Sequence, residues 1–411
     1  MRNKENKRKL LKNPWGYKES ILLSLIIILT GTIIEIITKG KGITPMKMPF
    51  NIITGLIFIA ALIYVYLNFN KKAFYQWLSG IPSALTSIVI FCILTVLIGI
   101  LPQNKNSETT IWQITGLNHI QRSWPFFLSG LYLMIVLGFT ILRRLKPINK
   151  RNIGFFLNHA GLWITLFAFI FGSGDIMSLK LKLFEGTEAK DLTIDKSLNI
   201  YRLPFKVKLI DFDIDEYPPE IVIINRFNNY IDTIFNENEI KEGLKIKFKD
   251  YVIEIIKYLN SSKKENNTFI ASEEFGSLPS AYLKVTKIIE NETYEGWIAP
   301  TILDKPFEYI SIDSIHAITL NIPKPKIFRS VIEIYNHNQL VKTTNVIVNK
   351  PFTYKGFKIY QMGYEEKMGK WSQISIFEIV YDPWLILVYI GLIMLIFGSV
   401  YLIWNGKSIK N

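Results

Sequence analysis

The stretch NIGFFLNHAGLWITLFAFIFGSGD (residues 152–175) places one histidine, His159, inside an almost wholly apolar run. A membrane-spanning helix needs about 20 apolar residues, and residues 153–172 supply such a run. An ionisable side chain at that depth costs free energy, so by default it marks a functional site. The stretch therefore predicts a membrane helix with His159 as its candidate functional residue.

Five further runs are long and apolar enough to span a membrane. The six predicted spans are residues 19–38, 51–68, 81–101, 126–142, 153–173 and 383–404. The first run is too long for a signal peptide and lacks a small-residue cleavage site, so we expect an uncleaved span. Asp382 followed by Pro383 is typical of a helix start and predicts where the last span begins. We therefore predict an α-helical membrane bundle.

Lysine and arginine concentrate in four segments, which fall on one side of the membrane if the six spans alternate. These segments are the tail 1–18, Lys71 with Lys72, residues 143–151 and the tail 405–411. The distribution predicts that both termini are cytoplasmic. The net charge of +14 then reflects topology and attraction to anionic lipid, and no nucleic-acid partner is expected.

Residues 174–382 have the polarity of a soluble domain, and this topology places them outside the cytoplasm. Several of their segments alternate or cluster β-branched and aromatic residues, which is typical of strands. The predicted strand segments are 205–215, 220–227, 244–259, 281–289, 316–322, 330–336 and 374–381. The fold class is therefore a bundle of about six spans, with a large and mostly β extracytoplasmic domain inserted between the fifth and sixth.

Several classes of chemistry lack their residues in this chain. The one cysteine, Cys92, lies in the third span, so the β domain has no disulfide and the chain has no CxxCH haem-attachment motif. Nucleotide-binding GxxxxGK[ST] and zinc-binding HExxH motifs are absent from the sequence. Glu35 and Asp175 lie near span ends, where we expect interfacial solvation. No acidic residue near mid-membrane supports a proton-coupled transporter.

The helical neighbours of His159 are mostly flat and apolar. Phe155, Phe156, Leu162 and Trp163 lie three or four residues away and share its face. Neutral imidazole is a common ligand of haem iron, and aromatic walls suit a porphyrin. Alternatively, His159 hydrogen-bonds a neighbouring helix, and the aromatic residues only pack. The residues themselves leave both interpretations open.

The other histidines are weaker candidates. His119 lies in the loop GLNHIQRSWPF beside Arg122 and Trp124, close to the predicted membrane surface. His316 and His337 lie in the β domain, where we expect no direct role. A haem held inside a membrane normally lies between two facing histidines, and the predicted spans contain only His159. Either a partner supplies the second ligand, or the site does not bind haem.

The segment SVIEIYNHNQLVKTTNVIVNKPFTYKGFKIYQMGYEE (330–366) resembles the carboxyl-terminal part of the ResB/CcsB family of System II cytochrome c biogenesis proteins. The elements SWPF (123–126), LNHAGL (157–162) and PFKVKLIDFDIDEYP (204–218) also follow the order of that family. The resemblance runs from about residue 81 to the carboxyl end. The matching residues of the first segment are Val348, Asn349, Pro351, Tyr354, Gly356, Phe357, Tyr360, Gln361 and Tyr364.

The chain also departs from this family in two places. The additional spans within 19–68 have no counterpart in the shorter members. Met362 and Gly363 stand where small hydroxyl residues are expected after Gln361. By resemblance, residues 81–173 are the three spans of a ResB-like core, 174–382 its β-rich domain and 383–404 its last span.

The resemblance implies a function in the bacterial cytoplasmic (inner) membrane, where haem crosses to the outer face and is attached to the CxxCH of apocytochrome c. His159 would be an axial ligand of haem b, the transported substrate, with Phe155, Phe156 and Trp163 as pocket walls. Tyr360 and Gln361 are candidates for contact with the apocytochrome.

The implied partner is a CcsA/ResC-type membrane protein, and the chain would be a subunit of a holocytochrome c synthase (haem lyase) complex that is not catalytic alone. Two other classes remain as alternatives. One is a membrane-anchored receptor or scaffold whose β domain binds an external partner without any cofactor. The other is a small-solute transporter.

Overall fold

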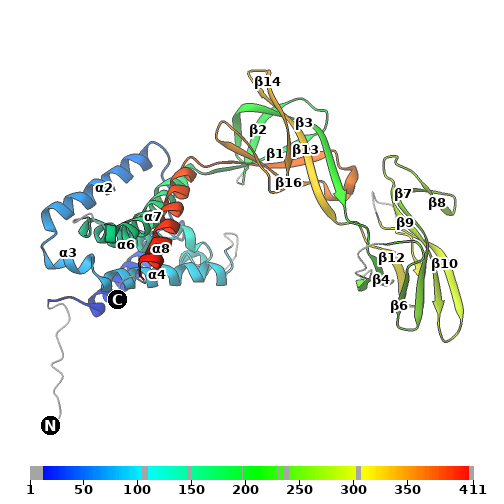
Figure 1. Ribbon diagram of the computed structural model, residues 1–411, viewed down its shortest axis with the longest axis horizontal. Coiled ribbons are helices and arrows are strands. Elements are labelled where there is room, and N and C mark those ends of the chain that lie inside the picture. The colour runs from blue at the N-terminus through cyan, green and yellow to red at the C-terminus, as the bar shows by residue number, and fades with distance from the viewer. Residues whose placement is uncertain are drawn as a thin grey trace, which may run out of the picture. The chain divides into compact units, whose positions relative to one another are not determined.

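The chain divides into two compact units, residues 1–176 with 382–411 and residues 177–381. Residues 1–12 of the predicted amino-terminal tail and 407–411 of the predicted carboxyl-terminal tail lie outside the described residues. The computed structural model describes residues 13–103, 110–145, 150–196, 198–228, 231–235, 240–301 and 307–406 (Figure 1).

The first unit is helical. Six of its described helices are long and apolar enough to cross a membrane, which confirms the six predicted apolar helices. Two short 3-10 turns are η1 (Ile120–Arg122), just before α6, and η2 (Ser173–Asp175), directly after α7. The helices are α1 (Tyr17–Ile37), α2 (Phe50–Phe69), α3 (Ala73–Leu78), α4 (Ile81–Ile100), α5 (Thr110–Ile114), α6 (Trp124–Arg143), α7 (Lys150–Gly172) and α8 (Leu385–Gly406).

Helix α6 is the centre of the bundle. Most of its residues are buried by α1, α2, α4 and α7, whereas most residues of the other five long helices are half-buried or exposed. Ile81 is 74% exposed and Ile403 72% exposed, for example. A soluble protein rarely exposes such extensive apolar surface. The exposed faces therefore suit contact with lipid, as the sequence predicted for a membrane protein.

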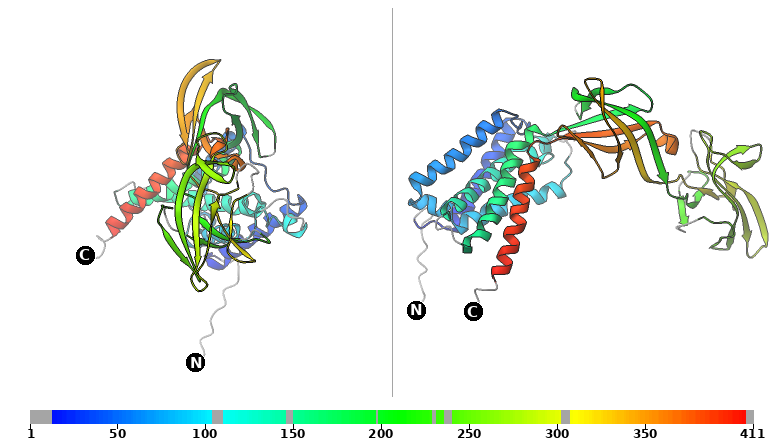
Figure 2. Two further views of the ribbon diagram at one scale, coloured as in Figure 1. Left: turned by 90° about the vertical axis from the view of Figure 1, so that its right-hand side faces the viewer. Right: turned by 45° about the horizontal axis from the view of Figure 1, so that its top comes forward.

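Helices α7 and α8 pack side by side (Figure 2), and glycines line their contact. A Cβ atom added at Gly161 would lie 2.5 Å from the backbone oxygen of Gly391. Gly398 lies in the same way against the backbone of Asn158. Small residues at such positions let the backbones of two membrane helices approach.

The regular part of α8 begins at Leu385, two residues later than the predicted start of the last span. Asp382 still acts as the expected cap, because its Oδ1 accepts a hydrogen bond from the backbone N–H of Trp384 at 3.0 Å. A tight first turn separates this cap from the regular helix.

The second unit is built from antiparallel strands, which confirms the predicted mostly β region. Its largest sheet has eight strands in the order β14-β13-β3-β2-β1-β17-β16-β15. Alternate side chains of these strands form one buried cluster, which includes Leu183, Val207, Ile332, Ile359 and Phe377. The strands are β1 (Met177–Phe184), β2 (Lys190–Asp195), β3 (Ile200–Glu216), β13 (Pro325–Asn336), β14 (Gln339–Ile347), β15 (Phe352–Tyr354), β16 (Phe357–Tyr364) and β17 (Ile374–Tyr381).

The remaining strands form two smaller sheets that share a second core, with Ile223, Ile253, Leu283 and Ile318 at its centre. This two-layer sandwich is inserted between β3 and β13 of the large sheet. The two connections run side by side, since Tyr217 donates its backbone N–H to Lys324 O at 2.8 Å. The strands are β4 (Ile221–Asn225), β5 (Ile231–Phe235), β6 (Lys245–Phe248), β7 (Tyr251–Glu265), β8 (Thr268–Ala271), β9 (Leu278–Lys287), β10 (Glu292–Ile298), β11 (Ile310–Ser311) and β12 (His316–Leu320).

One predicted strand segment needs correction. Residues 244–259 do not form a single strand, because a turn at Lys249 divides them into β6 and β7, which pair as a hairpin. Lys249 has a φ of 49°, in the left-handed region that a continuous strand does not use.

Candidate functional site

The imidazole of His159 is held by its own helix. Its Nδ1 lies 3.0 Å from the backbone oxygen of Phe155, one turn earlier in α7. A carbonyl oxygen only accepts, so Nδ1 carries the proton and Nε2 keeps its lone pair. The side chain is half-buried, and the described residues offer Nε2 no hydrogen-bond partner. His159 therefore presents a fixed imidazole with a free nitrogen at the surface of the bundle.

Two of the predicted aromatic walls lie beside this imidazole. The ring of Phe155 stacks on His159, with 3.8 Å between centroids and 29° between planes. Phe156 meets Phe155 edge-on at 5.8 Å. Phe155 thus covers one face of the imidazole and restricts its rotation.

The side chain of the third predicted wall, Trp163, is hydrogen-bonded to a neighbouring helix. Its indole Nε1 donates to the backbone oxygen of Met134 in α6 at 3.1 Å. The same indole fills the space above Gly138. Trp163 therefore fixes α7 to α6, one turn beyond His159.

Adjacent residues of the motif LNHAGL make different contacts. Asn158 donates from its side-chain amide to Ser399 Oγ of α8 at 2.7 Å, and Gly161 packs against the backbone of Gly391. The bond to another helix that the alternative interpretation assigned to His159 is thus made by Asn158. The hydrogen bond observed for His159 stays within α7.

The loop histidine, His119, lies in a buried polar cluster with Glu35 of α1. The Oε1 atom of Glu35 accepts from Gly42 N–H at 2.9 Å and from His119 Nε2 at 3.2 Å. Its Oε2 atom accepts from the backbone N–H of Trp124, the first residue of α6, at 2.8 Å. The carboxylate thereby caps a helix amino terminus, where negative charge is stabilised. The expected interfacial solvation of Glu35 is wrong, because its side chain is 0% exposed.

The other residues of this loop have structural contacts. The second ring nitrogen of His119 lies 2.6 Å from Asn118 Oδ1, so both of its nitrogens are engaged. The backbone oxygen of Arg122 accepts from Ile43 N–H at 2.7 Å, while the Arg122 side chain is exposed. Trp124 Nε1 is buried without a hydrogen-bond partner among the described residues.

Asp175 is half-buried and is also hydrogen-bonded to protein groups. Its Oδ1 accepts from the backbone N–H of Met48 at 2.8 Å. Its Oδ2 accepts from Asn51 Nδ2 at 2.6 Å and from Trp384 Nε1 at 2.7 Å. One carboxylate therefore joins the start of α2, the end of α7 and the approach to α8.

In the β unit, Gln361 lies in a buried network that joins β16 and β17 to β13, which is far from them in the strand order of the large sheet. Its Oε1 accepts from Ser330 Oγ at 2.6 Å and from Ser375 Oγ at 3.0 Å. Its Nε2 donates to the backbone oxygen of Gly363 at 3.1 Å, across a bulge at Met362. Gln361 thus fixes three strands, and the neighbouring Tyr360 is half-buried.

We expect Gln361→Ala to lower the free energy of unfolding by about 1–3 kcal/mol, because buried hydroxyl and carbonyl groups lose their partner. The matched control is Met362→Ala, since Met362 is 49% exposed and its truncation should cost less than about 0.5 kcal/mol. Denaturant unfolding of the full chain in detergent measures both. Equal values for the two variants would show that the network is energetically unimportant.

Three further residues of the segment 330–366 lie in turns. Asn349 has a φ of 64° in the turn after β14. Lys355 and Gly356 have φ of 48° and 81° and join β15 to β16 as a two-residue hairpin, which requires left-handed backbone at both positions. These positions therefore determine the path of the chain rather than form a binding site.

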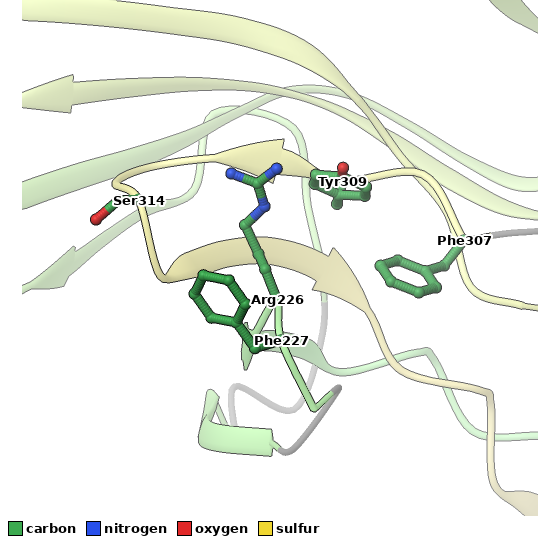
Figure 3. Close-up of a pocket in the computed structure, with 5 residues that line it drawn as sticks. All are labelled: Arg226, Phe227, Phe307, Tyr309 and Ser314. Atoms are coloured by element: carbon green, nitrogen blue, oxygen red, sulfur yellow. The ribbon is translucent and has the colours of Figure 1, made fainter.

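The β unit also carries a small pocket of about 220 Å³. Figure 3 shows its residues, Arg226, Phe227, Phe307, Tyr309 and Ser314. The Arg226 guanidinium carbon lies 5.6 Å from the centroid of the Tyr309 ring, and Phe227 is 81% exposed. Exposed aromatic and arginine side chains are typical of protein-contact surfaces. None of the predicted site residues lines this pocket.

A larger cleft of about 400 Å³ lies where the sandwich joins the large sheet. Glu216 and Lys370 are among its lining residues, and Lys370 Nζ also donates to Ser261 Oγ at 3.2 Å. Burial raises the pKa of Glu216, although the positive charge of Lys370 opposes that shift. With Asp215 and Lys326 also present, acidic and basic side chains balance in the cleft, which gives it no preference for a charged ligand.

Comparison with known proteins agrees with the resemblance seen in the sequence. The profile of the ResB-like family matches residues 299–372, which include β11 to β16 and the motif at 330–366. The predicted resemblance is thereby confirmed for this segment. A comparison with curated proteins gives no match.

Proposed function

We propose that this chain, ResB-like over residues 299–372, is the haem-handling membrane subunit of a System II cytochrome c biogenesis apparatus. The family itself suggests involvement in cytochrome c biogenesis, and the apolar helices suggest a membrane protein. In the proposal the membrane is the bacterial cytoplasmic (inner) membrane, both termini are cytoplasmic and the β unit lies outside.

One observation carries the proposal. The hydrogen bond from Nδ1 of His159 to Phe155 O fixes the imidazole tautomer in which Nε2 can bind a metal. The side chain is half-buried on an otherwise apolar helix, and Phe155 stacks on its ring. A donor of this kind fits the axial position of haem iron. His159 would hold haem b while it passes the membrane as substrate.

The second axial ligand would come from a CcsA/ResC-type partner. The sequence has four histidines, and His159 alone lies in a span. Both ring nitrogens of His119 are engaged by Glu35 and Asn118. Because His159 lies at the bundle surface, a partner helix could approach its free nitrogen from outside.

The chemistry on the outer face would be thioether formation between the haem vinyl groups and the two thiols of an apocytochrome CxxCH. That step requires reduced thiols and reduced iron, brought together in a suitable orientation. The proposal assigns this chain the binding and positioning of haem and assigns it no acid–base residue. The chain is then a subunit of a holocytochrome c synthase that is not catalytic alone, and its β unit would present the apocytochrome or brace the partner.

Maturation in cells tests this proposal. The full chain would be expressed with a CcsA-type partner and a reporter apocytochrome c in a strain that lacks its own System II proteins. Covalent haem in the reporter, measured by haem-stained gels, should fall at least about tenfold in His159→Ala because a buried metal ligand is lost.

The matched control is His337→Ala, which removes a histidine from the turn after β13 and leaves the bundle unchanged. This variant should mature the reporter as the unaltered chain does. Full maturation in His159→Ala, at equal protein level, would contradict the proposal and would favour a scaffold without a cofactor.

A further inference from the structure

A cation lies beside the candidate haem ligand. Arg144 follows the last residue of α6, and its guanidinium carbon lies 4.4 Å from the centroid of the Phe155 ring. The same ring stacks on the imidazole of His159, with 3.8 Å between the centroids. Arg144 and His159 therefore both contact Phe155, which places a cation close to the candidate haem ligand.

The charge of Arg144 is uncompensated in the described part of the chain. Its only contact there with a charged or aromatic group is the one with Phe155, and its side chain is exposed. The adjacent Arg143 differs, because its guanidinium donates to Gln76 O at 3.1 Å and to Ser79 Oγ at 3.3 Å.

No acidic side chain pairs with Arg144 among the described residues. Residues 69–80 and 143–152 contain neither aspartate nor glutamate. Glu19 lies at this end beside Gly16, to which Trp77 donates, but its Oε2 accepts from the backbone N–H of Gly16 at 2.8 Å. An arginine whose guanidinium makes no hydrogen bond or ion pair within the described residues is suited to bind an anionic ligand.

We propose that Arg144 binds the free carboxylates of the tetrapyrrole whose iron binds His159. This inference rests on the proposed function and specifies its substrate: a tetrapyrrole with ionised carboxylates at one edge. The apolar ring would lie along α7, where half-buried aromatic and aliphatic side chains such as Phe156 and Leu162 lie near His159. Its carboxylates would lie at the end of the bundle that carries Arg144, so the site distinguishes the two edges of the macrocycle.

The simpler role for Arg144 is that it covers Phe155 and extends into the solvent or to lipid phosphates, as arginines at membrane interfaces do. The two roles differ in one measurable respect. A carboxylate receptor distinguishes a free tetrapyrrole acid from its ester, whereas an interfacial arginine does not.

The experiment compares haemin with haemin dimethyl ester, in which both carboxylates are blocked. The full chain with a CcsA-type partner, in nanodiscs of neutral phosphatidylcholine, is titrated with each compound and followed by visible absorption. The unaltered complex should bind haemin about tenfold or more tightly than the ester, as expected for a charge-assisted hydrogen bond. Arg144→Gln should weaken haemin binding by that factor, leave ester binding unchanged and so remove the preference.

Arg143→Gln is the matched control, because it removes the neighbouring charge but should keep the preference for haemin. The inference would be overturned if Arg144→Gln kept the preference for haemin over the ester. It would also be overturned if the variant lost affinity for both compounds equally. Either result would leave the proposal of haem binding intact. Failure of the unaltered complex to bind either compound would instead reject the proposed function, and the role of Arg144 with it.

Discussion

Glu35→Ala is expected to lower the free energy of unfolding by about 3–5 kcal/mol. The carboxylate is completely buried and accepts three N–H groups, from Gly42, His119 and Trp124. Its removal leaves these donors buried and unpaired, which costs far more than loss of a surface contact. Denaturant unfolding of the full chain in detergent, followed by tryptophan fluorescence, measures the change.

A double-mutant cycle with His119→Ala isolates the histidine contact. The double variant should be less destabilised than the sum of the single variants, since each change removes the same bond. Glu274→Ala is the control, because Glu274 pairs with Lys263 on the exposed surface and its loss should cost less than about 1 kcal/mol. A Glu35→Ala cost as small as that of the control would mean that the carboxylate is not buried as described.

Gly161→Leu is expected to separate α7 from α8 and to prevent the chain from reaching its folded state in useful amounts. Even a Cβ atom at this position would lie 2.5 Å from Gly391 O and 2.7 Å from Leu395 N. Both are backbone atoms, so no side-chain rotation relieves the contact. Gly161→Ala should still fold, with a loss of about 1–3 kcal/mol from overpacking.

Gly99→Ala supplies the matched control for this seam. Gly99 also lies in a membrane-length helix, α4, but a Cβ atom there would meet nothing within 4 Å. Alanine has a helix propensity about 1 kcal/mol better than that of glycine, so this variant should be neutral or slightly stabilised. The two Gly→Ala changes therefore have opposite expected signs. Equal melting temperatures for both variants would contradict the close packing of α7 and α8.

The six long helices could be predicted from the sequence because each carries its own signal, an apolar run of membrane length. The burial of Glu35 could not be predicted in this way. Its partners lie 7, 84 and 89 residues away along the chain, and only the folded bundle brings them together. A carboxylate near a span end looks the same in sequence whether water or protein surrounds it.

In the β unit, too, the sequence predicted the strand segments but not every turn between them. Hydrophobic alternation predicted the strand segments, but the loop between β6 and β7 is Lys249–Asp250, in which Asp250 is the one turn-forming residue and no glycine or asparagine is present, so the hairpin was not expected. The departure at Met362 and Gly363 from the family pattern has a local structural explanation, because Met362 forms a bulge and Gly363 accepts from Gln361. Arg144 was missed because its relation to Phe155 depends on how α6 and α7 pack.

The two amino-terminal long helices, α1 and α2, are integral to the bundle. Gly31 of α1 packs against Pro125 of α6, where a Cβ atom would lie 2.6 Å from the proline Cα. Glu35 then caps α6, and Asn51 of α2 bonds Asp175 at the end of α7. Helix α1 thus holds the start of α6, and α2 holds the end of α7, the helix that carries His159.

The absorption spectrum of the purified complex tests the central claim most directly. The full chain, co-expressed with a CcsA-type partner and reduced with dithionite, should show the spectrum of a haem with two axial nitrogen ligands. His159→Ala should lose or shift this signal, whereas His337→Ala should retain it. An identical haem spectrum in the His159→Ala complex would contradict His159 as the ligand and return it to helix packing.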